Sequence, residues 1–306
     1  MTKQHSSLPD ISQGRFFFVR GFMRSGTNWV GNLLNLHPKI SCTGEFYFDE
    51  LYAALKKNIR IGYGLLSNPQ IRTHAEKGLE NLVKSCIVAG NNLLKKDGLI
   101  WYGDRTPRDI EPVLVNNCSY FLVIRDPRDV VVSWAYHLLR IKLSGQPDDP
   151  HKIHFDHHPE FYKKRKIFKQ NQEHFKKNPH ELFTDMEPWV RAIAKKWNIR
   201  MNLNLNSIEK IKKGLLNTSV LVVKYEKLHE DLINERIKMY RFLGLNPDEA
   251  DPVNELTMPG FKKERFNSHY RKGIVGDWNQ YFTPEISRWF HEEAQNMMLQ
   301  FGYNHS

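Results

Sequence analysis

The sequence is poor in cysteine and in long apolar stretches, and both shortages narrow the classes of protein to consider. Its three cysteines, Cys42, Cys86 and Cys118, cannot all pair, and none has the C-x-x-C spacing of metal or redox sites. The apolar run at residues 16–19 is far too short for a signal peptide or a membrane span. We therefore expect a cytoplasmic protein without a disulfide framework or a membrane span.

Acidic residues are also scarce relative to basic ones. The 306 residues include 45 Lys and Arg against 34 Asp and Glu, which gives a formal net charge of +11 at pH 7. This excess favours an anionic partner, such as a nucleotide, an acidic acceptor, a nucleic acid or an anionic surface, without choosing among them. Apolar residues make up 40% of the chain, which predicts a globular protein with a sizeable core.

Strand-like and helix-like segments alternate along the chain, which predicts an α/β fold. Four segments have the pattern of strands that run into loops: residues 16–19, 99–107, 120–129 and 218–228. Helices are expected from about Trp29 to Pro38 and over residues 128–141, the latter capped by Asp126. Two mostly helical insertions are expected at residues 51–96 and 141–213. We expect a flexible segment at residues 1–14, then a single domain with a doubly wound parallel sheet over residues 15–306.

In such a sheet the ligand binds beyond the carboxyl ends of the strands. Four residues that come just after predicted strands should therefore converge there: Arg24, Asp104, Arg125 and Tyr225.

A glycine-rich loop follows the first predicted strand. Gly21 and Gly26 have the G-x-x-x-x-G spacing of a phosphate-binding loop, but Thr27 stands where the lysine is expected and Asn28 where the magnesium ligand is expected. Backbone N–H groups at such a loop and helix start bind anions. Without the lysine and the metal ligand, a nucleotide with one phosphate at that end and no metal fits better than a triphosphate with magnesium. An ordinary tight turn is the alternative.

Three segments together resemble motifs of the sulfotransferase family. RSGTNW (residues 24–29) is similar to the family's 5′-phosphosulfate loop, VIRDPRDVVVSWAYH (123–137) to its 3′-phosphate segment, and YRKGIVGDWNQYFTPE (270–285) to its C-terminal motif. The resemblance implies a P-loop-like fold and a co-substrate, 3′-phosphoadenosine-5′-phosphosulfate (PAPS), used without a metal. The reaction implied is in-line transfer of the sulfuryl group to a hydroxyl, or in second place an amine, giving adenosine 3′,5′-bisphosphate (PAP).

The resemblance also implies the residues that bind PAPS. Its 5′ end would be held by Ser25, Gly26, Thr27 and Asn28, with Arg24 directed at the group transferred. Its 3′-phosphate would be held by Arg125, Ser133, Arg271, Lys272 and Gly273. Trp29 and Tyr225 match positions near the adenine, where flat rings can stack. The alternatives are a core role for Trp29 and surface ion pairs for Arg125 and Arg128.

Catalysis would need cations and a base. Arg24 would act as an electrostatic clamp, because an arginine does not give up its proton, and Arg105 matches a family position near the sulfate. The segment HPKISCTGEFYFDE (37–50) looks like that of the glycan and tyrosylprotein branches, which makes Glu45 the first candidate base and Asp104 the second. Glu45 could otherwise be a surface carboxylate. The chain thus resembles both the cytosolic branch and the glycan and tyrosylprotein branches. The latter are usually membrane-anchored and we expect no anchor here, so the acceptor class stays open.

Two other readings compete with a sulfotransferase: a P-loop nucleotide kinase or triphosphatase, and a non-catalytic nucleotide- or nucleic-acid-binding protein. The missing loop lysine argues against the first and the lack of a nucleic-acid motif against the second. We expect a small-molecule or glycan acceptor, which the charge allows to be anionic, and no nucleic-acid partner. The basic stretch at residues 151–180 is either a solvated helix and loop or a surface that holds an anionic acceptor. Neither the acceptor nor the oligomeric state has a signature in the sequence.

Overall fold

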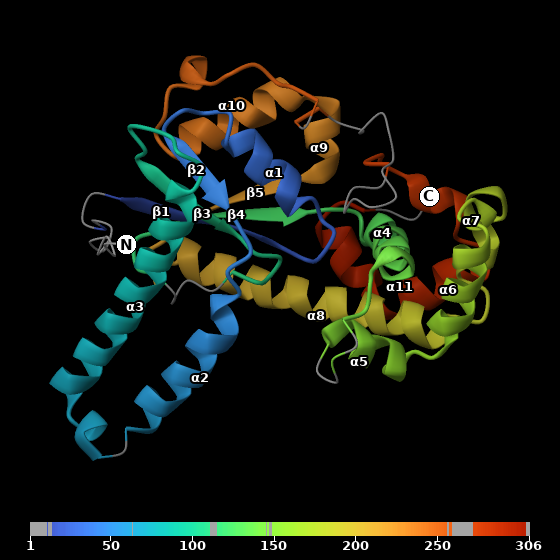
Figure 1. Cartoon of the computed structure of the whole chain (residues 1–306), viewed down its shortest axis with the longest axis horizontal. Helices are drawn as coiled ribbons and strands as arrows, with labels where there is room; N and C mark the ends of the chain where they lie inside the picture. Colours follow the sequence, from blue (N-terminus) through green and yellow to red (C-terminus); the bar gives the residue numbers. More distant parts are fainter. Residues whose placement is uncertain are drawn as a thin grey trace, which may run out of the picture. The chain divides into compact units, whose positions relative to one another are not determined.

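The computed structural model describes residues 11, 14–62, 64–110, 115–144, 146, 149–255, 257–258 and 272–303. The chain divides into two compact units, and Figure 1 shows their elements. The first unit comprises Met1–Phe22, Gly26–Ile124 and Asn204–Thr257, and the second Met23–Ser25, Arg125–Leu203 and Met258–Ser306. The division into a flexible segment and a single domain stays a prediction.

The first unit contains a parallel sheet of five strands in the order β2-β3-β1-β4-β5. The strands are β1 (Arg15–Gly21), β2 (Ile40–Thr43), β3 (Trp101–Arg105), β4 (Ser119–Ile124) and β5 (Ser219–Lys224). The α/β fold predicted from the alternating segments is therefore confirmed. Strand β1 is central, with β3 and β4 as its neighbours, so the loop that follows β1 leaves the sheet where the strand order changes direction.

Helices cover both faces of this sheet, which makes it doubly wound. Alternate side chains of a strand point to opposite faces. Phe17 and Val19 pack in one core with helices α1 (Thr27–Leu34), α9 (Tyr225–Glu230) and α10 (Leu232–Phe242). On the other face, Phe18 stacks on Tyr120 with ring centroids 5.3 Å apart, and Lys84 of α3 (Pro69–Asn92) lies over the Phe16 ring. Figure 1 shows α3 and α1 on opposite sides of the strands.

The second unit is helical. Its elements are α4 (Pro127–Arg140), α5 (Pro150–His157), α6 (Glu160–Gln170), α7 (His174–Lys177), η2 (Pro179–Leu182), the first part of α8 (Glu187–Lys212), η4 (Asp277–Gln280) and α11 (Pro284–Gln300). Helix α4 begins where the sequence predicted, because the Asp126 side chain accepts a hydrogen bond from Arg128 N at 2.9 Å and Pro127 occupies the first turn. Phe161, Phe183 and Trp189 are fully buried and form its core.

Strand β2 was not predicted from the sequence, because it has only four residues and lies between turn formers such as Pro38 and Gly44. The insertion after it forms α2 (Phe48–Ile61), η1 (Gly64–Ser67) and α3, as expected, and η3 (Pro247–Glu249) follows α10. Of the helices in the part of the chain that the structure describes, none is long and apolar enough to cross a membrane.

Candidate active site

The loop after β1 follows a path that requires glycine at both predicted positions. A Cβ atom on Gly21 would lie 2.5 Å from the Val123 carbonyl oxygen. Gly26 has a φ of 102°, in the left-handed region, and a Cβ there would lie 2.6 Å from Cδ2 of Tyr225. Arg24 also has a positive φ, of 66°, which is rare for a residue with a Cβ and recurs at functional sites. The loop is therefore a specific structure rather than a generic turn.

Some hydrogen-bond donors at this loop have no acceptor among the residues that the structure describes. Gly26 occupies the N-cap position of α1, and no side chain within the described residues caps the helix, so its first N–H groups are available to an anion. The Ser25 hydroxyl is buried, with 1% of the residue exposed and no hydrogen-bond partner among the residues described. Thr27 is buried and Asn28 half-buried. A buried hydroxyl and the uncapped N–H groups of a helix start are both donors of the kind that anionic groups accept from.

Trp29 and Tyr225 are both buried and pack edge to face, with centroids 5.2 Å apart. The Trp29 ring also meets the His229 ring at 4.9 Å, and its Nε1 donates to the Thr257 carbonyl at 2.6 Å. These contacts give Trp29 the core role that the sequence left open. Because the Tyr225 ring covers Gly26, the pair also supports the glycine loop.

The predicted catalytic residues of the first unit lie at the ends of two neighbouring strands. Thr43 of β2 pairs with Asp104 of β3, so the segment after β2 runs beside Arg105. Phe46 N donates to Asp104 Oδ1 at 3.4 Å, and a Cβ on Gly44 would lie 2.6 Å from the Arg105 carbonyl oxygen. The main chain on both sides of Glu45 is thus held against Asp104 and Arg105.

The two candidate bases differ in access to solvent. Asp104 is 1% exposed and accepts hydrogen bonds from Arg20 Nη1 at 2.7 Å and from the Thr106 hydroxyl at 2.8 Å. Glu45 is exposed and accepts a hydrogen bond from the Tyr47 hydroxyl. Burial, with help from the Glu45 carboxylate, raises the pKa of Tyr47. Glu45 is therefore the exposed member of this pair, whereas Asp104 is buried in an ion pair with Arg20.

Arg20 and Arg105 of the first unit each donate a hydrogen bond to a neighbouring side chain. Arg20 was missed from the sequence, although a charged residue at the end of an apolar strand is a signal for a buried ion pair; it is 0% exposed and lies over the Phe18 ring. Arg105 is half-buried and donates to the Asn32 side-chain oxygen of α1 at 3.0 Å. The Arg105 guanidinium is therefore held in place at the carboxyl end of β3, beside helix α1.

In the second unit, residues from all three sequence motifs are bonded to one another. Arg125 donates to the Arg24 carbonyl at 3.3 Å and to the Ile274 carbonyl at 3.0 Å, and Arg24 Nε donates to the Ser133 hydroxyl at 3.3 Å. Arg125 is 5% exposed, so the alternative that made it a surface residue was wrong. Arg24, Arg125 and Ser133 therefore lie together with the C-terminal segment that contains Ile274.

Asp129 holds the C-terminal segment in place and was also missed. Its buried carboxylate accepts hydrogen bonds from Gly276 N at 2.8 Å and Trp278 N at 3.0 Å, and one of its oxygens lies 3.8 Å from Arg125. Burial raises the pKa of Asp129, and the neighbouring Arg125 opposes this rise. Its place as the last Asp of RDPRD was the sequence signal that could have identified Asp129. Asp129 positions the segment without pointing to a ligand itself.

Arg128 pairs with Asp126 at 2.7 Å, as the alternative reading held, but it is 3% exposed and lies 3.7 Å from the Trp278 ring centroid, so it is no surface residue. Lys272 Nζ lies 3.2 Å from Asp277, and Gly273 has a φ of 62°. Arg271 lies outside the described residues.

The chemistry available is that of anion binding and proton transfer. The described residues contain no group of three or more His, Cys, Asp or Glu side chains that could hold a metal ion. Hydroxyl, N–H and guanidinium donors are the ligands of phosphate and sulfate groups.

Comparison with known proteins identifies the family. A family model described as a sulfotransferase domain matches residues 107–302, more than half of the chain. A 3-beta-hydroxysteroid sulfotransferase of Cavia porcellus is 26% identical over 230 residues, which cover 68% of this chain and 67% of the relative. Sulfotransferase 1E1 of Homo sapiens is 25% identical over 200 residues, which cover 60% of this chain and 55% of the relative, so the match spans only about half of its length.

Two solved structures are also similar. Mouse sulfotransferase SULT7A1 complexed with PAP has a TM-score of 0.45 at 18% identity, covering 93% of this chain and 85% of that one. The sulfotransferase domain of the Synechococcus PCC 7002 olefin synthase has a TM-score of 0.47 at 12% identity, covering 98% of this chain and 99% of that one. The family predicted from the three motifs is confirmed by the match over residues 107–302: the chain belongs to the family of PAPS-dependent sulfotransferases.

Proposed function

We propose that the protein transfers the sulfuryl group of PAPS to a hydroxyl group of an acceptor by in-line displacement and releases PAP. One observation carries this proposal. Arg24, Arg125 and Ser133 are hydrogen-bonded to one another and to the segment that contains Ile274, which joins residues of three motifs far apart in the sequence. Such a cluster of donors suits the second anion of PAPS, which an ordinary nucleotide monophosphate lacks.

PAPS would be held at its two anionic ends. We assign the 5′ end to Ser25, Gly26, Thr27 and Asn28, whose buried hydroxyl and uncapped N–H groups support an anion there. We assign the 3′-phosphate to Arg125, Ser133, Lys272 and Gly273, with Arg271 as a further expected ligand. PAPS supplies the sulfuryl group, and no metal is needed for its transfer. We assign Tyr225 to the adenine end of PAPS, with Trp29 packed against it as support, because the Tyr225 ring lies at the glycine loop.

Glu45 is the proposed base. A base must reach the acceptor's hydroxyl proton, and Glu45 is exposed whereas both Asp104 oxygens accept hydrogen bonds from buried neighbours. Arg24 and Arg105 would stabilise the negative charge that develops on the sulfate oxygens and on the bridging oxygen. Both stay protonated throughout, so the proton taken by Glu45 leaves to solvent after transfer.

For the acceptor, we propose a small hydroxylated molecule as the first class to test and a glycan as the second. The names of the relatives, which include a hydroxysteroid sulfotransferase, support this order. An amine acceptor ranks below a hydroxyl. We also propose a cytoplasmic location, which the three free cysteines support.

The experiment compares binding of PAP and of adenosine 5′-monophosphate to wild type and to Arg125→Ala by calorimetric titration. Loss of a charge-assisted hydrogen bond to the 3′-phosphate, about 2 kcal/mol, should weaken PAP roughly 30-fold. The monophosphate should weaken less than about threefold. Arg288→Ala is the matched control, because Arg288 is an exposed arginine of the same unit, and it should change neither affinity.

Equal weakening of the two ligands by Arg125→Ala would contradict the assignment of the 3′-phosphate. Titrations with ATP–magnesium and with a short oligonucleotide test the competing readings. Tighter binding of either than of PAP would overturn the proposed donor. A labelled-sulfate transfer screen across acceptor classes would then identify the acceptor.

A further inference from the structure

Helix α6 of the second unit presents a row of polar and cationic side chains along one face. Its apolar residues Phe161 and Phe168 are buried in the core of the unit. Residues three and four apart lie on the same side of a helix. A second set of residues with this spacing runs along the adjoining side of the helix: Tyr162, Arg165, Lys166, Lys169 and Gln170.

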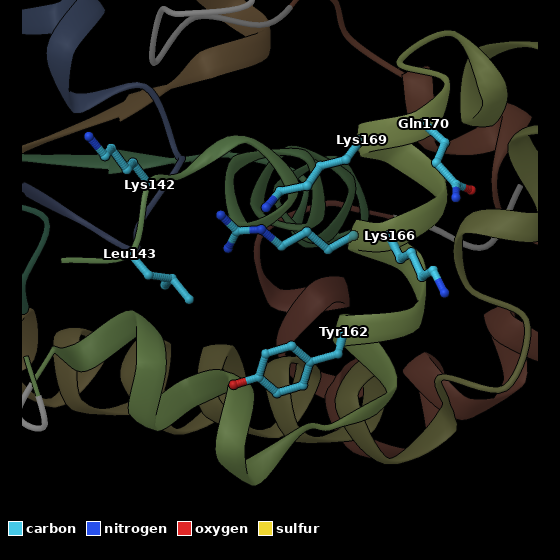
Figure 2. Close-up of a pocket in the computed structure, with 7 residues that line it drawn as sticks. Lys142, Leu143, Tyr162, Lys166, Lys169 and Gln170 are labelled. Atoms are coloured by element: carbon cyan, nitrogen blue, oxygen red, sulfur yellow. The ribbon is translucent and has the colours of Figure 1, made fainter. Parts of the chain in front are cut away.

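This face of α6 lines a surface hollow with a volume of about 570 Å³, which Lys142 and Leu143 complete from the loop after α4. Figure 2 shows Tyr162 and Lys169 extending from α6 towards the side of this loop. Four of the seven lining residues are cationic and none is acidic. The hollow therefore combines positive charge with apolar surface from Leu143, the tyrosine ring and the lysine stems.

Hydrogen bonds hold the walls of the hollow in place. Arg165 Nη2 donates to the Ile141 carbonyl at the end of α4, which ties α6 to the loop. Asp149 accepts hydrogen bonds from Ser144 N at 2.7 Å and from the Ser144 hydroxyl at 2.8 Å. The Tyr162 hydroxyl donates to Asp156 at 3.0 Å. A site whose walls are already ordered loses little entropy when a ligand binds.

Among the described residues, no carboxylate forms an ion pair with the lysines that line the hollow, which are Lys142, Lys166 and Lys169. Arg165 is half-buried, and burial lowers its pKa. Cations gathered around one hollow repel each other, and an anion bound among them removes that repulsion.

The hollow is separate from the residues assigned to the donor. Helix α4 has 14 residues and is therefore about 20 Å long. Arg125 precedes its first turn and Lys142 follows its last, so the two residues lie at opposite ends of one rigid helix in one unit. The 3′-phosphate at Arg125 cannot reach the hollow.

We propose that this hollow is a second anion site, which binds a sulfate or phosphate ester group attached to an apolar organic body. The cations would bind the ester group, while Leu143 and the Tyr162 ring would pack on the body. The apolar wall favours an organic ester over a free inorganic ion. This inference stands independently of the donor and the reaction proposed above.

The experiment titrates the protein, saturated with PAP, with 4-nitrophenyl sulfate, inorganic sulfate and uncharged 4-nitrophenol, monitored by calorimetry. Wild type should bind 4-nitrophenyl sulfate at least tenfold more tightly than either other probe. Lys166→Glu/Lys169→Glu should weaken 4-nitrophenyl sulfate at least tenfold, and Leu143→Ser should weaken it without changing the affinity for inorganic sulfate. Lys163→Glu is the matched control, because Lys163 is an exposed lysine of the same helix outside the hollow.

Absence of saturable binding to wild type would overturn the proposal, as would equal weakening by Lys163→Glu and by Lys166→Glu/Lys169→Glu. Equal affinity for inorganic sulfate and the aryl ester would overturn the apolar part of the site. Repeating the titration without PAP separates the two proposals, since failure of PAP to bind counts against the proposed function and leaves the test of the hollow intact.

Discussion

Replacing Gly26 by alanine tests the glycine loop at its tightest point. Gly26 has a φ of 102°, and an alanine Cβ would lie 2.6 Å from Cδ2 and 2.9 Å from Cε2 of Tyr225. The tyrosine ring has little room to retreat, because it is buried and packs on Trp29 at 5.2 Å. The substitution therefore combines backbone strain with overpacking.

The cost can be worked from these two parts. The left-handed conformation costs about 1 kcal/mol for alanine relative to glycine, and overpacking of a buried ring costs about 1–3 kcal/mol. We expect the free energy of unfolding to fall by about 2–4 kcal/mol and the Tm by roughly 4–10 °C. Displaced loop N–H groups should lose about 2 kcal/mol of PAP binding, roughly a 30-fold weaker affinity.

Thermal unfolding and PAP titration of Gly26→Ala measure both effects. The double variant Gly26→Ala/Tyr225→Leu identifies the cause, since removing the ring relieves the clash while the backbone strain remains. Its free energy of unfolding should exceed, by about 1–2 kcal/mol, the value expected if the effects of the two single substitutions simply added. Strict additivity, or a Gly26→Ala protein with wild-type Tm and wild-type PAP affinity, would refute the reasoning.

Two further predictions concern catalysis and pH. Glu45→Gln should lower turnover at least about 100-fold while PAP binds as before, because a general base contributes about 10²–10⁴ in rate. Glu230→Gln, at an exposed glutamate of the same unit, is the matched control and should leave turnover unchanged. Unchanged turnover in Glu45→Gln would remove the residue from the mechanism. Burial lowers the pKa of His154 to about 4, and its Nε2 accepts a hydrogen bond from Trp189 Nε1 at 2.8 Å. Since the fold favours the neutral ring, the stability it contributes is present above about pH 6.5 and is lost as pH falls towards 4. After allowance for solvent screening, we expect His154 to contribute about 1–2 kcal/mol to the free energy of unfolding at neutral pH. Urea unfolding at pH 7 and pH 4.5 should show a smaller loss of stability in His154→Gln than in wild type. An equal loss in both proteins would count against this origin.

Local sequence patterns were sufficient to predict the elements whose formation depends on residues close together in the chain. The apolar run before the glycine loop predicted β1, and Asp126 with Pro127 predicted the start of α4. Strand β2 escaped, because four residues with mixed polarity carry too little signal and its place at the sheet edge depends on pairing with β3.

The candidate site was predicted less completely than the fold. The motifs identified Arg125 and Ser133, but not Asp129, which accepts hydrogen bonds from a main-chain segment 147 residues away. They named Asp104 as a candidate base, but not its burial against Arg20, an ion pair across 84 residues. Such partners are chosen by sheet order and packing, which a local pattern does not encode.

By itself, the sequence determined the parallel α/β fold, the glycine loop and the family, because apolar periodicity, glycine spacing and helix caps act over a few residues. Only the tertiary structure decided that Arg128 is buried over Trp278, that Glu45 rather than Asp104 is exposed, and that the α6 lysines line a hollow. Burial and charge environment depend on which distant segments meet, and that is settled only when the chain packs.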